Sequence, residues 1–223
     1  MSKPLLSPSI LAADFGRLTE EIGEVKKYAH SIHVDVMDGH FVPNLTIGPV
    51  VVNSLKREKQ IDLPLNVHLM ISEPGRYGPQ FELEEDDLLI FHHETPARSE
   101  QLIEQLSAER VGLGMTQKPK EDPSNLFPYL SELEEVLVMS VKPGFGGQEF
   151  MPEALDTIAA LREEIDGREL DTKIAVDGGI NEDTAGAAYA AGADVLVAGS
   201  AVFGASDRPA ALRRLEKTAL EGG

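Results

Sequence analysis

The chain has 223 residues, of which 42% are hydrophobic, and this length can bury one sizeable core. We therefore expect a single domain over residues 1–223. Thirty-eight acidic against twenty basic residues give a formal charge of −18, which argues against nucleic acid or an anionic membrane as a partner. The absence of cysteine excludes a disulfide scaffold and a thiolate metal site. The N-terminal segment lacks a long apolar signal core and no eighteen consecutive residues are apolar, which predicts a soluble cytoplasmic protein.

Short runs of apolar and β-branched residues alternate with helix-like segments along the whole chain. The predicted strands are 5–11, 31–37, 65–70, 87–92, 110–115, 135–141, 172–176 and 193–198. The predicted helices are 17–28, 48–57, 73–81, 100–109, 125–130, 152–165, 183–190 and 209–220. This alternation predicts a parallel sheet covered by helices, and eight such units in about this length favour an α/β fold closed into a (β/α)8 TIM barrel.

Metal-ligand residue types stand at the ends of several predicted strands. The run 31–44 reads SIHVDVMDGHFVPN and places His33 and Asp35 two residues apart, on one face of a strand. Taken alone, this segment is compatible with a His33–Asp35 pair that binds no metal. In a barrel, however, active groups gather where strands end, and His68 and Asp177 lie at such positions too. Two imidazoles and two carboxylates suit a divalent cation with positions left open for substrate oxygens.

Glycine pairs follow the last three predicted strands. They occur in PGFGGQ at 143–148, VDGGI at 176–180 and AGSA at 198–201, and none is a Walker or dinucleotide fingerprint. Any one of them is more often just a turn. Three in consecutive late loops predict a phosphate site made by main-chain N–H groups, which also allows an acidic protein to bind an anion.

These motifs resemble those of the ribulose-phosphate 3-epimerase family. PSILAAD at 8–14, HVDVMDGHFVPN at 33–44, VHLM at 67–70, PGFGGQ and VDGGI occur in the family's order and spacing, nearly from end to end. The resemblance implies a (β/α)8 barrel that inverts C3 of a ketose phosphate, foremost D-ribulose 5-phosphate to D-xylulose 5-phosphate in the pentose phosphate pathway. It also implies one divalent ion per subunit (zinc, iron, manganese or cobalt) and a homo-oligomer, either a dimer or a hexamer.

The resemblance further assigns residues to roles. The implied metal ligands are His33, Asp35, His68 and Asp177, and the implied catalytic pair is Asp35 and Asp177. The implied substrate contacts are Ser9, His68, Gly144, Phe145, Gly146, Gly147, Asp177, Gly178, Gly179, Gly199 and Ser200. Met37, Met70 and Met139 resemble the family's apolar lining around the intermediate, although ordinary core filling explains each of them equally well.

Such residues make the implied chemistry physically sensible. A ketose C3–H is poorly acidic, and a metal on the C2 carbonyl oxygen stabilises the enediolate formed when that proton leaves. Asp35 and Asp177 come from the second and seventh strands of a closed ring. A planar intermediate between them can lose a proton to one carboxylate and regain it from the other, which predicts inversion.

Some positions depart from the family pattern. Lys142 precedes PGFGG where the family more often has a neutral or acidic residue, and the fifth strand ends in GLGMTQKP instead of an asparagine–proline form. These departures leave the substrate open, so D-allulose 6-phosphate 3-epimerase is the close alternative. His92 and His93 follow the fourth strand and can reach the mouth, but a loop-facing pair is more often solvated, and we interpret it so.

Two further alternatives belong to other classes of function. Decarboxylation or aldol chemistry on a related barrel calls for a lysine beside the aspartates, but Val34 and Val36 flank Asp35. A non-catalytic sugar-phosphate-binding barrel would have lost a carboxylate, and both Asp35 and Asp177 are present.

Overall fold

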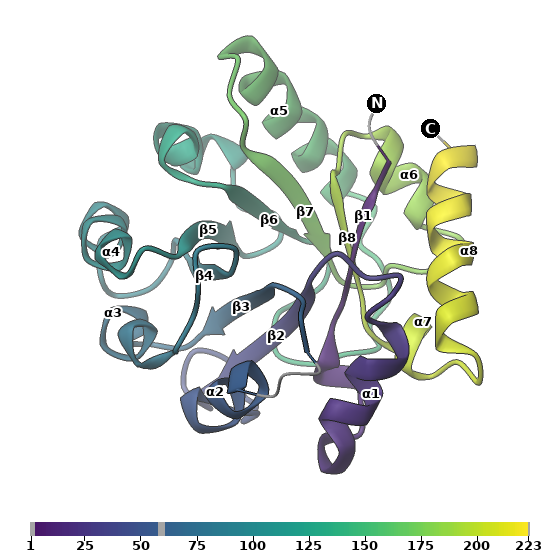
Figure 1. The fold of residues 1–223 in the computed structure, drawn as a ribbon. Coiled ribbons are helices and arrows are strands. Elements are labelled where there is room, and N and C mark those ends of the chain that lie inside the picture. The colour runs from purple at the N-terminus through teal and green to yellow at the C-terminus, as the bar shows by residue number, and fades with distance from the viewer. Residues whose placement is uncertain (1–2, 58–60, 223) are drawn as a thin grey trace.

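The computed structural model describes residues 3–57 and 61–222, and within them eight parallel strands form one sheet that curls into a barrel (Figure 1). The strands are β1 Leu5–Pro8, β2 Ile32–Met37, β3 Leu65–Met70, β4 Leu88–His92, β5 Gly112–Gln117, β6 Glu135–Met139, β7 Lys173–Asp177 and β8 Val195–Ala198. Each strand from β2 onward pairs with the next in the chain, and β8 pairs with β1. A parallel bridge between Ser9 and His33 then joins the end of β1 to β2. The predicted barrel fold is confirmed.

The helices lie around the outside of the strands (Figure 1). They are α1 Leu18–Val25, α2 Pro49–Arg57, α3 Pro74–Tyr77, α4 Ser99–Leu106, α5 Ala154–Gly167, α6 Ala185–Ala190, α7 Ser200–Phe203 and α8 Arg208–Glu221. In the part of the chain that the structure describes, none of these helices has the length and apolar character needed to span a membrane.

Several predicted boundaries are wrong, and local chemistry explains why. The first strand ends at Pro8, because the Ser9 hydroxyl accepts the N–H of Leu11 and begins a 3-10 turn over Ile10–Ala12. The predicted helix 125–130 is replaced by two 3-10 turns, Pro123–Asn125 and Phe127–Glu132. Pro128 lies within this stretch and has no N–H to continue an α-helix.

The predicted helix 73–81 is similarly divided into α3 and a 3-10 turn over Gly78–Gln80. The sequence analysis did not predict α7, which has only four residues.

The strands bury side chains on both faces. On β4, Leu89 and Phe91 belong to the large cluster between the sheet and the helices. Leu88 and Ile90 alternate with them and belong to a second cluster, together with residues of β6, β7 and β8. This second cluster fills the interior of the barrel. A parallel sheet covered on both faces accounts for the nearly continuous apolar runs that predicted the strands.

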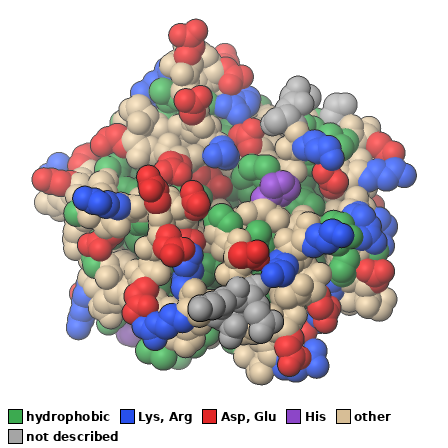
Figure 2. Space-filling model, in the orientation of Figure 1, with side chains coloured by type: hydrophobic (Ala, Val, Ile, Leu, Met, Phe, Trp, Pro, Cys, Tyr) green, Lys and Arg blue, Asp and Glu red, His purple; other side chains and the backbone are tan. Residues whose placement is uncertain are grey.

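The surface carries the charge. Acidic and basic side chains are interspersed across the face in Figure 2. Some of the ion pairs join elements that are distant in sequence: Arg208 at the start of α8 lies 2.8 Å from both Glu21 and Glu24 of α1. Although acidic residues are in excess, some of them therefore form ion pairs that hold α8 against α1.

One acidic residue lies inside the barrel instead. Glu135 starts β6 on the same face as Leu137 and Met139 and is 2% exposed. Its Oε1 atom has no hydrogen-bond partner among the residues described. Burial raises the pKa of Glu135 from 4.5 to about 7, although the charge of His33 opposes this shift. Ionised Glu135 is therefore a source of instability at neutral pH.

We predict that Glu135→Gln stabilises the metal-free protein at pH 8. Because the folded-state pKa of Glu135 is the higher one, wild-type stability falls as pH rises from about 4.5 to about 7 and stays reduced above that. A rise of the pKa from 4.5 to about 7 corresponds to about 3 kcal/mol. Urea denaturation of both proteins should show a difference of up to that size at pH 8 and little difference at pH 4. Glu132→Gln, at an exposed position three residues before Glu135, is the control and should change neither stability. Equal stabilities of the Glu135→Gln and wild-type proteins at pH 8 would contradict the prediction.

Candidate metal centre and active site

Four side chains that the sequence analysis singled out meet at one end of the barrel. His33 and Asp35 come from β2, His68 from β3 and Asp177 from the end of β7. One ligand atom from each lies within 4.8 Å of the others. The register places Asp35 directly beside His68 on the neighbouring strand. Strand alternation and ring closure thus bring together the residues that the sequence separates by up to 144 positions (177 − 33).

The spacing of these atoms fits a divalent cation. Asp35 Oδ1 lies 3.5 Å from His33 Nε2 and 3.4 Å from His68 Nδ1. His33 Nε2 lies 3.4 Å from His68 Nδ1 and 3.9 Å from Asp177 Oδ2. Ligand atoms held tetrahedrally at about 2.1 Å from an ion stand about 3.4 Å apart, so the set needs only small shifts to bind one. The two imidazoles and two carboxylates are also a chemically suitable donor set.

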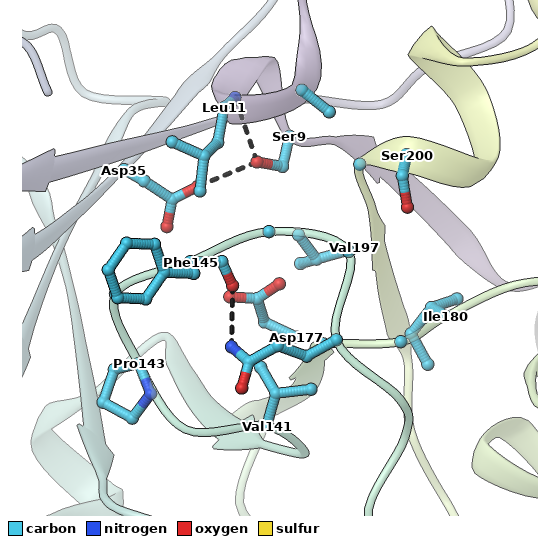
Figure 3. Close-up of a pocket in the computed structure, with 18 of the residues that line it drawn as sticks. Ser9, Leu11, Asp35, Val141, Pro143, Phe145, Asp177, Ile180, Val197 and Ser200 are labelled. Carbon is cyan, nitrogen blue, oxygen red and sulfur yellow. Dashed lines mark hydrogen bonds between the residues drawn. The ribbon is translucent and has the colours of Figure 1, made fainter. Parts of the chain in front are cut away.

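The second oxygen of Asp35 is held by a hydroxyl. Ser9 Oγ donates a hydrogen bond of 2.8 Å to Asp35 Oδ2 and accepts one of 3.3 Å from the N–H of Leu11 (Figure 3). The N–H of Leu11 therefore orients the hydroxyl toward the carboxylate. Asp35 is left with Oδ1 facing the two histidines.

The two aspartates differ sharply in proton affinity. Burial acts against ionisation of Asp35, but the charge of His33 and hydrogen bonds from both histidines hold the pKa of Asp35 well below its usual range. Burial raises the pKa of Asp177 to about 7; His33 opposes this shift and the charge of Asp35 adds to it. Two neighbouring carboxylates whose pKa values are driven apart are typical of an acid–base pair.

The two histidines differ in the same way. Burial disfavours the charged form of His33, but Asp35, Asp177 and Glu135 together raise its pKa to about 9. Burial lowers the pKa of His68 to about 4. In the metal-free protein at pH 7, the positive charge at this centre therefore resides on His33.

A cavity of about 380 Å³ opens above this centre. The carboxylates of Asp35 and Asp177 point into it from β2 and β7 (Figure 3). The other predicted site residues that line it are Ser9, Met37, Met70, Met139, Gly144, Phe145, Gly146, Gly147, Gly178, Gly179, Gly199 and Ser200. His33 and His68 have no exposed surface and do not line the cavity, so they lie beneath its floor.

The glycines in the cavity wall are not equivalent. Gly179 has φ of +64°, and a Cβ atom there would lie 2.4 Å from the backbone nitrogen of Phe150. The path of the chain therefore requires glycine at this position whatever the cavity binds. Gly146 has no positive φ, and a Cβ atom there would meet only Leu11, at 3.9 Å. Gly146 is thus the position at which a side chain tests ligand approach without disturbing the fold.

Side-chain amides brace the loop that carries Gly146. Gln148 Nε2 donates hydrogen bonds of 2.7 Å to the backbone oxygens of Lys142 and Phe145. Asn44 Nδ2 donates one of 2.8 Å to the oxygen of Gly144, across from the loop after β2. Neither amide was predicted to have a role. Both lie inside the quoted motifs, but their acceptors are backbone atoms that only the folded loops bring near.

Lys142 also lines the cavity. Among the lining residues of the described chain it is the one basic side chain, whereas Asp35, Glu149 and Asp177 are acidic. The departure from the family pattern at this position therefore adds a cation to the cavity wall.

The interpretation of His92 as solvated is wrong. His92 is the last residue of β4, has no exposed surface, and shares the inward face of that strand with Leu88 and Ile90. Its Nε2 atom lies 2.9 Å from His68 Nε2. His93 faces the other way and contacts Ser99 Oγ at 3.0 Å. Applying the alternation of inward and outward side chains to the last residue of the predicted strand 87–92 would have placed His92 inside.

Comparison with known proteins gives close matches over nearly the whole chain. Residues 5–203 match the model of the ribulose-phosphate 3-epimerase family. The ribulose-phosphate 3-epimerase of Mycobacterium bovis is 44% identical over 216 residues, which cover 97% of this chain and 93% of that protein. The ribulose-phosphate 3-epimerase of Bacillus subtilis is 43% identical, with coverage of 94% and 97%.

Solved structures agree on the fold. The protein named KGPDC from Streptococcus mutans superimposes with a TM-score of 0.68 at 11% identity and covers 99% of each chain. At this identity the likeness concerns the barrel architecture alone.

The pKa values predict that metal affinity rises with pH. A bound ion must displace the proton of His33, whose pKa is about 9, so the apparent affinity should increase about tenfold per pH unit between pH 7 and pH 9. Below pH 7 the rise should be steeper, because Asp177 is then protonated as well. Competition between the protein and a chelator for Co²⁺ measures this dependence. A chelator-corrected affinity that is flat from pH 7 to pH 9 would show that His33 carries no proton to displace.

We also predict that Gly146→Ala weakens binding of a phosphorylated ligand while leaving the fold intact. Losing one hydrogen bond to a charged group costs about 1.5–3 kcal/mol, which corresponds to a roughly tenfold or greater rise in the Kd for inorganic phosphate. Calorimetric titration gives the Kd, and thermal denaturation checks the fold. Gly23→Ala, in α1 and with open space around its Cβ position, is the matched control. An unchanged Kd in Gly146→Ala would contradict the prediction that this loop binds the phosphate.

Proposed function

The chain belongs to the ribulose-phosphate 3-epimerase family and is an isomerase, and we propose that it inverts C3 of D-ribulose 5-phosphate to give D-xylulose 5-phosphate. The observation that carries the proposal is the pair of carboxylates, Asp35 and Asp177, that face one cavity from β2 and β7. The names of the relatives support the pentose phosphate as substrate. The glycine-lined loops after β6, β7 and β8 supply main-chain groups for its phosphate.

The proton transfers follow from the environments of the two aspartates. Asp35 stays ionised because its pKa is low, so it can accept the C3 proton on one face of the sugar. Asp177 lines the same cavity from β7, and a carboxylate oxygen there can carry a proton and deliver it to the other face. In the reverse direction the two residues exchange roles. Ser9 keeps the Asp35 carboxylate in place through its hydrogen bond to Oδ2.

We propose His33, Asp35, His68 and Asp177 as the ligands of one divalent ion, which can be zinc, iron, manganese or cobalt. Such an ion would supply positive charge for the substrate oxygen that becomes negative when the C3 proton leaves.

The methionines contribute in a different way. Met37, Met70 and Met139 line the cavity with apolar groups that have no proton to donate. We propose that this lining keeps water from protonating the intermediate, so that the aspartates alone decide the stereochemistry.

The second candidate substrate is D-allulose 6-phosphate. Lys142 keeps this candidate open, because it departs from the family pattern at a position in the cavity lining that a substrate would contact. We further propose that residues 1–223 form one domain, that the protein acts in the cytoplasm and that it assembles as a dimer or hexamer. Leu45 and Val50, which are 73% and 84% exposed, are apolar surface that a second copy would cover.

Proton-exchange NMR in D₂O tests the reaction and the substrate together. Ribulose 5-phosphate should gain deuterium at C3 and be converted to xylulose 5-phosphate faster than allulose 6-phosphate is epimerised. Faster turnover of allulose 6-phosphate would select the second candidate. No exchange into either sugar by the metal-loaded enzyme would reject both.

We predict that Asp177→Asn lowers the rate of epimerisation by about 10² to 10⁴, the usual contribution of a general acid–base group. The amide keeps an oxygen ligand but cannot carry the proton. Asp35 still serves one face, so deuterium should enter C3 of a single epimer without inversion. Asp183→Asn, an exposed residue that lies after the same strand and outside the cavity lining, should behave as wild type. Wild-type epimerisation by metal-loaded Asp177→Asn would refute the two-face mechanism.

A further inference from the structure

His92 and Glu94 lie outside the candidate ligand set and extend from it into the protein. Together with the ligand His68 they form a row of three side chains. His68 Nε2 lies 2.9 Å from His92 Nε2, and His92 Nδ1 lies 3.4 Å from Glu94 Oε2. The ring centroids of the two histidines are 5.1 Å apart and their planes differ by 20°. Rings stacked face to face cannot bring two nitrogens as close as 2.9 Å, so these rings meet edge to edge in nearly one plane. This is the geometry of an N–H···N hydrogen bond.

The proton positions along the row follow from the ligand geometry. His68 Nδ1 is the atom that faces Asp35 Oδ1 and His33 Nε2, each at 3.4 Å. Once Nδ1 binds an ion in place of its hydrogen bond to Asp35, it carries no proton, so the proton of a neutral His68 is then on Nε2. His92 Nε2 must then accept it, which leaves the proton of His92 on Nδ1, facing Glu94. Each ring thus fixes the tautomer of the next.

The end of the row away from the metal ligands is the contact between His92 and Glu94. Within the described chain, neither His92 Nδ1 nor Glu94 Oε2 has a hydrogen-bond partner, and the two atoms lie 3.4 Å apart, so a small shift would pair them. The backbone N–H of Lys118 donates to Glu94 Oε1 and anchors the carboxylate. Glu94 is therefore fixed on one side by the residue that follows β5, and it is available to His92 on the other.

Water has little access to the row. His92 has no exposed surface, and the ring of Phe41 rests on it with centroids 4.6 Å apart. Lys118 Nζ lies over the ring of Phe41, 5.0 Å from its centroid. In such a water-poor environment a hydrogen bond to an imidazole is stronger, and an unpaired N–H is more costly, than at the surface.

We propose that His92 and Glu94 are positioning residues that hold His68 as its Nε2–H tautomer, with the Nδ1 lone pair directed at the metal. The proposal rests on the metal centre of the proposed function. Groups that hydrogen-bond the second nitrogen of a ligating histidine fix its orientation and raise its basicity, and their loss typically costs 10–100-fold in metal affinity. A role in packing alone would give no such dependence on hydrogen-bond acceptance.

Variants at His92 separate hydrogen bonding from packing. His92→Phe keeps a planar ring but cannot accept the proton of His68, whereas His92→Gln offers an amide oxygen that can. Glu94→Leu and Glu94→Gln make the same comparison at the partly exposed end of the row, where folding is least at risk. His93→Phe is the matched control, because His93 contacts Ser99 and not the row.

Two measurements on Co²⁺-loaded protein test whether the row holds His68 in place. Chelator competition gives the Kd for Co²⁺, and ¹H NMR detects the hyperfine-shifted, exchangeable Nε2 proton of His68. We expect His92→Phe and Glu94→Leu to raise the Kd by roughly 10–100-fold and to speed exchange of that proton. His92→Gln and Glu94→Gln should restore most of the Co²⁺ affinity and most of the protection of that proton from exchange. His93→Phe should match wild type in both measurements.

Failure of this proposal is distinguishable from failure of the proposed function. Wild-type affinity and an unchanged Nε2 signal in folded Glu94→Leu and His92→Phe would overturn the positioning role while leaving the metal centre intact. Equal losses in the Gln and apolar variants would assign the effect to packing and also overturn it. A wild-type protein that binds no Co²⁺ at the four ligands would overturn the metal centre and the positioning role together.

Discussion

The buried charge of Asp35 is the constraint on which the site depends. This carboxylate is 5% exposed on a strand where Val34 and Val36 flank it, and an ionised group in such a place persists only with partners. Ser9 satisfies one oxygen, and His33 and His68 face the other. These partners lie on β2, on β3 and just after β1. The carboxylate is therefore stable only where the barrel closes, and the Ser9–His33 bridge marks that closure.

The interior of the barrel carries more negative charge than one histidine can balance. Asp35, Asp177 and Glu135 all act on His33 and raise its pKa, while Asp177 and Glu135 themselves hold protons more tightly than usual. Burial is the largest cause of the raised pKa of Asp177 and the charge of Asp35 adds to it, whereas His33 keeps Asp35 ionised. A divalent ion would relieve the repulsion between the two carboxylates. The proximity of the two aspartates thus contributes both to ligand affinity and to their acid–base asymmetry.

Most residues of the site could be predicted from the sequence, because two geometric rules are enough to bring their side chains together. Alternation along a strand fixes that His33 and Asp35 share a face, and a parallel barrel brings strand ends such as His68 and Asp177 together. His92 obeys the same alternation but was assigned to a loop, because its partner His68 is known only from the folded structure. The need for glycine at Gly179 was equally hidden. It arises from the approach of Phe150, a tertiary contact that no local pattern encodes.

The charge of the cavity links ion binding to substrate binding. On the proposed function, an anionic sugar phosphate must enter a chain with a net charge of −18, through a wall whose acidic residues outnumber Lys142. Main-chain N–H groups attract a phosphate without changing that net charge. The remaining repulsion comes from Asp35 and Asp177, and these are the carboxylates that an ion would neutralise. The ion and the substrate should therefore each strengthen the binding of the other, because thermodynamic linkage is reciprocal.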